Sequence, residues 1–209
     1  MSGIQPSTLS EDGYTEAYST PRTEYRNMEI VSTMGTGSLG RELDLEPVVS
    51  DLQSQLGEVV NANFRGDSMV TLRLEKDGPA YTIYRTGSFQ IRGAETEEDL
   101  VSAEGRFREA LNELEIEVDN YQFEHVTSVF METLDQRVDL ETAMIALGLE
   151  NAEYEPEQFP GLIYRPPSFE VTLLVFASGK IIIGGTTDRN QALDAVNHLR
   201  EQLSTIERV

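Results

Sequence analysis

The fold is decided by two stretches of the sequence, EYEPEQFPGLIYR at residues 153–165 and LLVFASGKIIIGG at residues 173–185. Each contains a short apolar run bounded by proline or glycine, which predicts strands joined by tight turns. Phe159 stands directly before Pro-Gly, and Phe176 stands directly before Ala-Ser-Gly-Lys. The two stretches therefore predict a pair of aromatic rings at one end of an antiparallel sheet.

Working outward, the second half of the chain supplies further elements around these stretches. A strand is expected near residues 121–129, and Val138-Asp139-Leu140-Glu141 opens a helix that continues through Ala143 and Leu147. Further strands are expected near 152–155, 162–164, 171–176 and 180–183. A last helix from Asp188 buries apolar residues at helical spacing: Leu193, Val196, Leu199, Leu203 and Ile206.

The first half of the chain repeats this order of elements. A strand at Ile30 leads to Leu43-Asp44-Leu45-Glu46 and a helix that ends near Leu56. Strands near 59–63, 69–74, 80–84 and 89–92 follow, and Thr96 opens a long helix with an acidic first turn. Equivalent positions lie 92 to 95 residues apart, as in Gly93 and Gly185 or Leu45 and Leu140. The repeat predicts an α+β fold of two antiparallel units with helices on one face.

These patterns divide the chain into three parts. Residues 1–28 contain Pro6 and Pro21, show no period and are interpreted as a flexible tail. Residues 29–118 form the first unit and residues 119–209 form the second.

Composition narrows the class of protein. The chain has 16 Lys+Arg against 37 Asp+Glu, a net charge of −21, and only two lysines, Lys76 and Lys180. Such an acidic, lysine-poor composition is typical of a halophile; an ordinary acidic protein is the alternative.

The absence of cysteines excludes thiol chemistry and cysteine metal sites. No apolar run reaches the ~20 residues of a membrane helix, and no signal peptide is visible, so a cytoplasmic protein without membrane contact is expected.

Signals for an enzyme are weak. Residues Gly35 to Gly40 match GxGxxG, but the hairpin-like strands that follow do not suit a dinucleotide-binding unit. His125 and His198 have no neighbours at metal-ligand spacing and are interpreted as structural. No catalysed reaction and no cofactor are expected.

The long, ungapped stretches 153–165 and 173–185 strongly resemble the second repeat of the TATA-binding protein family, and the two-unit plan resembles that family's direct repeat. The resemblance implies a saddle, a curved antiparallel sheet with four helices on its convex side. Its concave face would sit in the DNA minor groove. There, apolar wedges such as Phe159 and Phe176 can open a base step and kink the duplex. The alternative is that both rings belong to the core.

The resemblance assigns two sets of site residues. The partner set, for transcription factor B, is the acidic loop with Glu155, Glu157 and Gln158. The DNA-binding set is placed mainly in the second unit, with a few residues from the first: Val126, Phe159, Arg165, Leu174, Phe176, Lys180, Ile182, Val31, Arg73 and Tyr84.

The first unit departs from the family's pattern. The family's first wedge phenylalanine falls on Asp67, its companion on Tyr84, and its Ser-Gly-Lys turn on residues 86–88, which lack the lysine. Thr82, Gln90, Arg92 and Gly184 also differ from the family. The family's two central asparagines are aligned with Glu29 and Glu124, carboxylates that cannot donate to the acceptors of the A·T minor groove.

The sequence is therefore identified as a divergent paralogue of the haloarchaeal type. The leading hypothesis is a factor that bends DNA in transcription initiation or its regulation, with the second repeat dominant. Binding is expected to be weaker and less TATA-selective than is usual in the family. The alternatives are an interaction module that engages transcription factor B and has largely lost DNA, and, more remotely, a nucleotide-binding enzyme.

Overall fold

The computed structural model describes residues 28–116, 118 and 120–206. The predicted tail therefore lies outside the described residues, except for Met28. Met28 is 2% exposed and packs in the core of the second unit.

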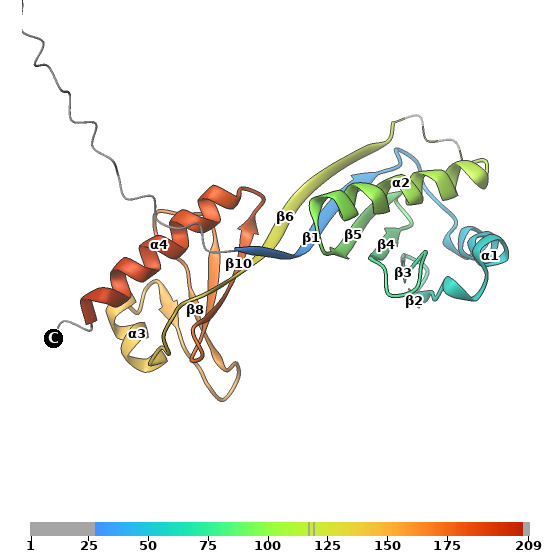
Figure 1. The fold of residues 1–209 in the computed structure, drawn as a ribbon. Helices are drawn as coiled ribbons and strands as arrows, with labels where there is room; N and C mark the ends of the chain where they lie inside the picture. The colour runs from blue at the N-terminus through green and yellow to red at the C-terminus, as the bar shows by residue number, and fades with distance from the viewer. Residues whose placement is uncertain (1–27, 117, 119, 207–209) are drawn as a thin grey trace, which may run out of the picture.

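Among the described residues, ten strands form one sheet in which every neighbouring pair is antiparallel. The order β2-β3-β4-β5-β1-β6-β10-β9-β8-β7 places the first strand of each unit at the centre (Figure 1). This arrangement confirms the predicted α+β saddle of two repeated units. The strands are β1 (Glu29–Ser38), β2 (Asn63–Arg65), β3 (Met69–Leu72), β4 (Ala80–Tyr84), β5 (Ser88–Ala94), β6 (Gln122–Thr133), β7 (Ala152–Glu153), β8 (Gly161–Tyr164), β9 (Thr172–Phe176) and β10 (Lys180–Thr186).

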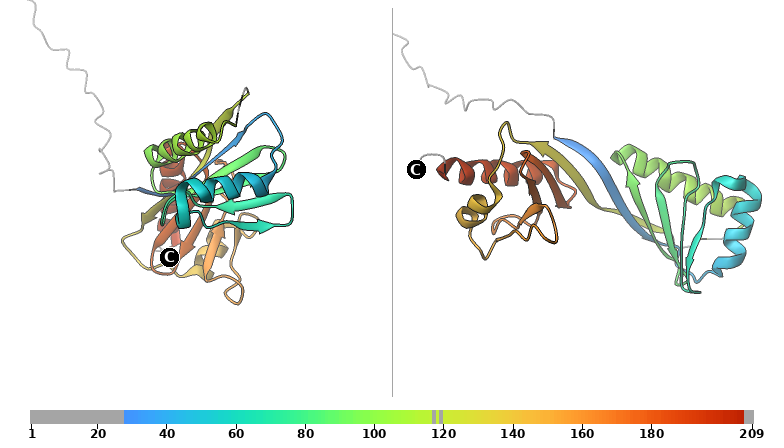
Figure 2. Two further views of the ribbon diagram at one scale, coloured as in Figure 1. Left: turned by 90° about the vertical axis from the view of Figure 1, so that its right-hand side faces the viewer. Right: turned by 90° about the horizontal axis from the view of Figure 1, so that it is seen from below.

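Each unit contributes two helices, α1 (Leu45–Leu56) and α2 (Glu97–Glu113) in the first, α3 (Leu140–Leu147) and α4 (Arg189–Ile206) in the second. The long helices α2 and α4 run along the same side of the curved sheet, as the two views of Figure 2 show. Thr96 caps α2 by accepting from the backbone N–H of Asp99 at 3.0 Å, as its acidic first turn predicts. None of the described helices is long and apolar enough to cross a membrane.

One predicted strand is wrong. The chain near residues 59–63 forms a short 3₁₀ turn, η1 (Gly57–Val59), and the strand begins only at Asn63. Val60 N–H donates to Gly57 O at 3.2 Å, and Asn61 N–H donates to Val59 O at 2.9 Å. These local hydrogen bonds replace a strand ladder at this point.

The apolar side chains at the beginning of each central strand pack in the core of the other unit. Met28 and Ile30, at the start of the first unit, pack in the core of the second, which includes Phe130. Tyr121 and Phe123, at the start of the second unit, pack against the core of the first. The pairing of β1 with β6 therefore carries each unit's first apolar side chains across the centre of the sheet. The domain boundary between residues 118 and 119 stays a prediction.

The nucleotide interpretation of the Gly35–Gly40 segment is wrong. Gly35 and Gly37 lie inside strand β1, which has β5 and β6 as antiparallel neighbours. A Cβ at Gly35 would come within 2.2 Å of the Phe123 ring, and one at Gly37 within 2.3 Å of the Phe89 ring. These two rings stack with centroids 6.0 Å apart. The glycines make room for aromatic packing and do not form a phosphate-binding turn.

Candidate nucleic-acid interface

Side chains alternate between the two faces of the sheet. In β9, Leu173 and Val175 are 0–1% exposed beneath the helices, while Leu174 and Phe176 between them are partly exposed on the other side. We call this helix-free side the concave face. Because paired residues of neighbouring strands point to the same side, the register of the sheet assigns each paired strand residue to one face.

The second unit ends its concave face with the predicted aromatic pair. The rings of Phe159 and Phe176 meet edge to face, with centroids 5.8 Å apart. Gly161 is paired with Phe176 in β8 and β9. A Cβ on Gly161 would lie 2.7 Å from the Phe159 ring and 3.1 Å from the Phe176 ring. The glycine therefore leaves the space in which both rings sit.

The rest of the second unit's concave face is mostly apolar, as predicted. Leu174 lies between Ile163 and Ile182, its partners in β8 and β10. All three side chains are partly exposed. Sequence reasoning missed Ile163, although its position two residues after Gly161 would have placed it on this face.

Two cations border this apolar surface. Lys180 begins β10 and is exposed on the same face as Ile182. Arg165 follows β8 and lies 3.9 Å from Glu153, where both side chains are more than half exposed. An exposed pair at this distance contributes little to stability, so Arg165 stays accessible at this border, as the exposed Lys180 does.

The first unit's concave face is more polar. Thr71 and Thr82 face each other, with their hydroxyl oxygens 3.2 Å apart. Gln90 accepts from the Arg92 guanidinium at 2.5 Å. Arg73, predicted to bind DNA, is exposed and donates to the carbonyl of Gly78 in the β3–β4 turn. These contacts show why the first unit offers less apolar surface than the second.

Tyr84 and Met69 occupy the end of the first unit's concave face. They are directly paired in β4 and β3, and both are partly exposed. Tyr84 was predicted from sequence, whereas Met69 was not. Arg85, which follows Tyr84, points to the other side of the sheet.

Glu29 and Glu124 lie on the two central strands, β1 and β6, but not at the pair that marks the centre of their ladder. Strand β1 pairs with β6 so that Thr33 lies opposite Ser128, and these are equivalent residues of the two units at an offset of 95. The centre of the saddle therefore passes through this pair. Glu29 is opposite Met131 and Glu124 is opposite Thr36, four residues or about 13 Å from the centre.

Hydroxyl groups, not carboxylates, flank the true centre. Ser32 and Thr127 lie on the concave face next to the buried pair, beside Val129 and Met34. A hydroxyl can both donate and accept a hydrogen bond. The ladder skips Val31 in β1 and Val126 in β6. These two bulges shift the side-chain alternation and could not be located from sequence spacing.

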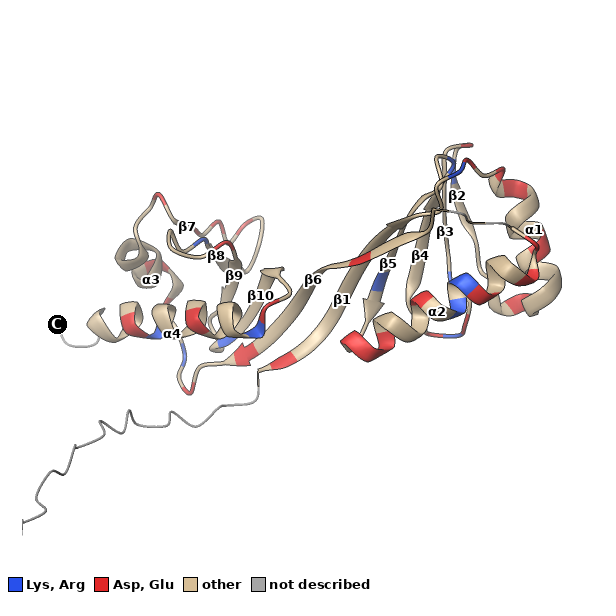
Figure 3. Ribbon diagram, turned by 90° about the horizontal axis from the view of Figure 1, so that it is seen from above, with Lys and Arg blue, Asp and Glu red and all other residues tan. Residues whose placement is uncertain are grey.

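Charge is distributed unevenly over the two sides of the molecule. Figure 3 shows acidic residues concentrated along α1 and α2. Helix α2 alone has six acidic residues against two arginines: Glu97, Glu98, Asp99, Glu104, Glu109 and Glu113 against Arg106 and Arg108. The strands of the concave face carry three cations and three carboxylates: Arg65, Arg92 and Lys180 against Glu29, Glu124 and Glu153. Arg73, Arg165 and Glu95 each follow directly after a strand. In a chain of net charge −21, this face is therefore much less acidic than the helix side.

The predicted partner residues are together in the loop between β7 and β8. Glu155, Glu157 and Gln158 are all exposed. The backbone N–H groups of Gln158 and Phe159 both donate to the carbonyl of Glu155 at 2.9 Å. The loop is therefore a hydrogen-bonded turn that presents its acidic side chains beside the aromatic pair.

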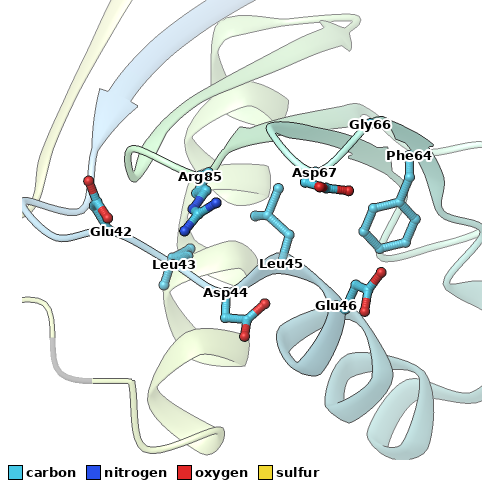
Figure 4. Close-up of a pocket in the computed structure, with 9 residues that line it drawn as sticks. All are labelled: Glu42, Leu43, Asp44, Leu45, Glu46, Phe64, Gly66, Asp67 and Arg85. Atoms are coloured by element: carbon cyan, nitrogen blue, oxygen red, sulfur yellow. The ribbon is translucent and has the colours of Figure 1, made fainter.

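A depression of about 690 Å³ lies in the first unit between the start of α1 and the β2–β3 turn (Figure 4). Arg85 lines it together with four carboxylates and Phe64: Glu42, Asp44, Glu46 and Asp67. Arg85 is therefore not a replacement on the concave face for the lysine missing from the 86–88 turn.

The two histidines make local contacts. His125 Nε2 lies 3.0 Å from Ser128 Oγ, and the His198 ring stacks on Tyr164 with centroids 6.5 Å apart. No group of three or more metal-ligating side chains gathers within residues 28–116, 118 and 120–206.

Comparison with known proteins identifies the family. A family model described as "Transcription factor TFIID (or TATA-binding protein, TBP)" matches residues 27–114 and again residues 122–206. The chain belongs to the TATA-binding protein family. This is a family of transcription factors, which confirms that the chain is not an enzyme.

Individual TATA-binding proteins resemble the chain over most of its length. The TATA-box-binding protein C of Halobacterium salinarum is 38% identical over 183 residues, 86% of this chain and 98% of that protein. The TATA-box-binding protein of Pyrobaculum calidifontis is 40% identical over 185 residues, 87% of each. The structure of the Methanococcus jannaschii TATA-binding protein superposes with a TM-score of 0.70 at 29% identity, covering 85% of this chain and 98% of that one. The haloarchaeal relatives confirm the halophilic origin predicted from composition.

Proposed function

We propose that this protein binds double-stranded DNA in the minor groove through its concave face and bends it, as a factor in archaeal transcription initiation or its regulation. The observation that carries the proposal is the Phe159–Phe176 pair at the end of an apolar concave surface. Apolar side chains in such a position can enter a base step, and unstacking a step costs on the order of a few kcal/mol. The contact of the apolar face with the bent duplex offsets this cost. This activity places the protein with the nucleoid.

The second unit dominates this interaction. Its concave face offers Leu174, Ile182 and Val126 to the minor groove, with Lys180 and Arg165 at the border. The first unit contributes Val31, which is 38% exposed, Tyr84 and Arg73. Its threonines and Gln90 carry polar groups that lose hydration on binding. Affinity is therefore weaker than an apolar face in both units would give.

Sequence selectivity depends on the centre of the face. Ser32 and Thr127 supply hydroxyl donors there, so the carboxylates at residues 29 and 124 do not meet the central base edges. Their negative charge acts four residues along β1 and β6 from the central pair, where it opposes binding without reading a central base. We infer that the protein still prefers A·T-rich DNA. Its selectivity is smaller than it would be if both units supplied hydrogen-bond donors and cations.

The test is a bending-sensitive assay at fixed molar KCl. A duplex labelled at both ends reports affinity and bend angle by energy transfer, with a TATA sequence and a scrambled one. Phe159→Ala and Phe176→Ala should weaken binding about tenfold and reduce the bend, because alanine cannot fill an opened step. Phe64→Ala is the matched control, since Phe64 is 39% exposed but lies outside the concave face. Unchanged bending in both phenylalanine variants would refute the proposal.

The same end of the molecule is proposed to engage transcription factor B. Glu155, Glu157 and Gln158 form an exposed loop, and α3 and its C-terminal end present Ile145 and Leu149, which are 71% and 70% exposed. Acidic side chains beside exposed apolar ones suit a partner with a basic, partly apolar surface. If DNA binding proves absent, this contact alone would define the protein as an interaction module.

A further inference from the structure

We propose that Met69 is the first unit's wedge: it enters a base step together with Tyr84 and takes the place that the Phe159–Phe176 pair has in the second unit. The inference rests on the proposed DNA binding by the concave face. It assigns a DNA-contacting role to a residue that the sequence pattern did not single out.

The register of the sheet makes Met69 and Gly161 equivalent. Met69 is paired with Tyr84 where β3 meets β4, and Gly161 is paired with Phe176 where β8 meets β9. The turns that follow the two aromatic residues are also alike. Gly87 N–H donates to Tyr84 O at 2.8 Å, and Gly179 N–H donates to Phe176 O at 2.8 Å. The two hairpin ends therefore share their strand pairing and the turn that follows, but they carry different side chains.

The two units fill this equivalent space from different positions. In the second unit, Gly161 has no side chain, and the ring of Phe159 occupies the space above it, within 2.7 Å of where a Cβ would stand. In the first unit, the residue equivalent to Phe159 is Asp67, which is exposed in the β2–β3 turn. A carboxylate loses its hydration on entering stacked bases and cannot serve as a wedge. Met69 instead projects a side chain from the position where the second unit has none.

Methionine has the properties that such a position needs. It is apolar, unbranched and able to adapt to an irregular gap, and it is among the residues that open base steps in minor-groove complexes. Met69 is partly exposed on the concave face and is the direct strand partner of Tyr84. Its side chain is narrower than the two edge-to-face rings of the other unit. We therefore expect two unequal kinks, with the smaller one at the first unit.

The experiment measures affinity and bend angle by energy transfer, on the TATA duplex in molar KCl. Met69→Ala should reduce the bend and weaken binding about fivefold, because the wedge is shortened. Met69→Leu should keep most of the bend, since it retains an apolar side chain of similar volume. The control is Met144→Ala, which removes the same residue type from α3 on the helix side of the sheet and should leave the bend angle unchanged.

A rebuilt unit gives an independent readout. Asp67→Phe combined with Met69→Gly reproduces the second unit's arrangement and should increase the bend beyond that of the unmodified protein. If Phe159→Ala reduces the bend while Met69→Ala and the rebuilt variant leave it unchanged, the Met69 proposal is wrong and the proposed function stands. If the unmodified protein neither binds nor bends the duplex, both are wrong.

Discussion

Adding one methyl group at Gly161 tests whether the position of the aromatic pair controls DNA bending. The Cβ of Gly161→Ala would lie 2.7 Å from one atom of the Phe159 ring, 3.2 Å from another, and 3.1 Å from the Phe176 ring. Carbon atoms in contact prefer about 3.5–4.0 Å. The Phe159 ring must therefore move outward by about 0.8 Å or more, away from its edge-to-face contact with Phe176.

The expected cost falls on binding more than on folding. Overpacking in a closed core typically costs about 1–3 kcal/mol, but both rings are partly exposed and can shift toward solvent. The free energy of unfolding should therefore change by less than about 1 kcal/mol. On DNA the displaced ring no longer matches the opened step, and one poorly matched contact is worth about 1–3 kcal/mol. Affinity should fall about tenfold or more, and the bend angle should decrease.

The assay compares denaturant unfolding with binding and bending in the same molar KCl buffer. Gly105→Ala serves as the control, because Gly105 lies in α2 with open space around a Cβ, remote from the concave face. That variant should gain about 0.5–1 kcal/mol of stability from helix propensity and bind DNA normally. The reasoning is refuted if Gly161→Ala binds and bends like the unmodified protein while Phe159→Ala does not.

Three further outcomes are expected. Replacing Glu155 and Glu157 with lysine should abolish recruitment of transcription factor B to the DNA complex in a gel-shift experiment. Affinity for DNA alone should be retained or rise. Normal recruitment would mean that the partner binds elsewhere. Gly37→Ala should lower the free energy of unfolding, measured with denaturant, by about 1–3 kcal/mol, because the added Cβ would overlap the Phe89 ring. An unchanged free energy of unfolding would contradict the role of Gly37 in making room for that ring. Burial raises the pKa of Tyr81 to about 12, so its contribution to stability is complete below pH 10 and is lost as pH rises from 10 to 12. Tyr81→Phe should make this loss of stability less steep without removing it, because burial also raises the pKa of Tyr121 and of Tyr164; an unchanged slope in denaturant unfolding would show that Tyr81 does not contribute.

The sequence by itself determined the elements and their repetition. Hydrophobic periodicity and the spacing of turns depend on neighbouring residues, so the order of strands and helices in each unit could be predicted, with one misplaced strand near residue 60. The turns after Phe159 and Phe176 placed both rings at the end of the sheet for the same local reason. Composition likewise indicated a halophilic protein. The count of acidic residues and lysines can be taken from the sequence without knowing which residues are in contact.

Only the tertiary structure decided what lies at the centre of the concave face. Register between β1 and β6 joins residues about 95 positions apart, and the bulges at Val31 and Val126 shift it by single residues. Spacing along the sequence therefore could not show that Glu29 and Glu124 lie four residues from the central pair, while Ser32 and Thr127 lie next to it. Met69 was missed because its place opposite Tyr84 depends on the pairing of β3 with β4, and its proposed role follows only from the Phe159 ring that fills the space above the equivalent Gly161. A side chain's place on a curved, ten-stranded sheet is set by the strands paired with it, and local sequence does not contain that information.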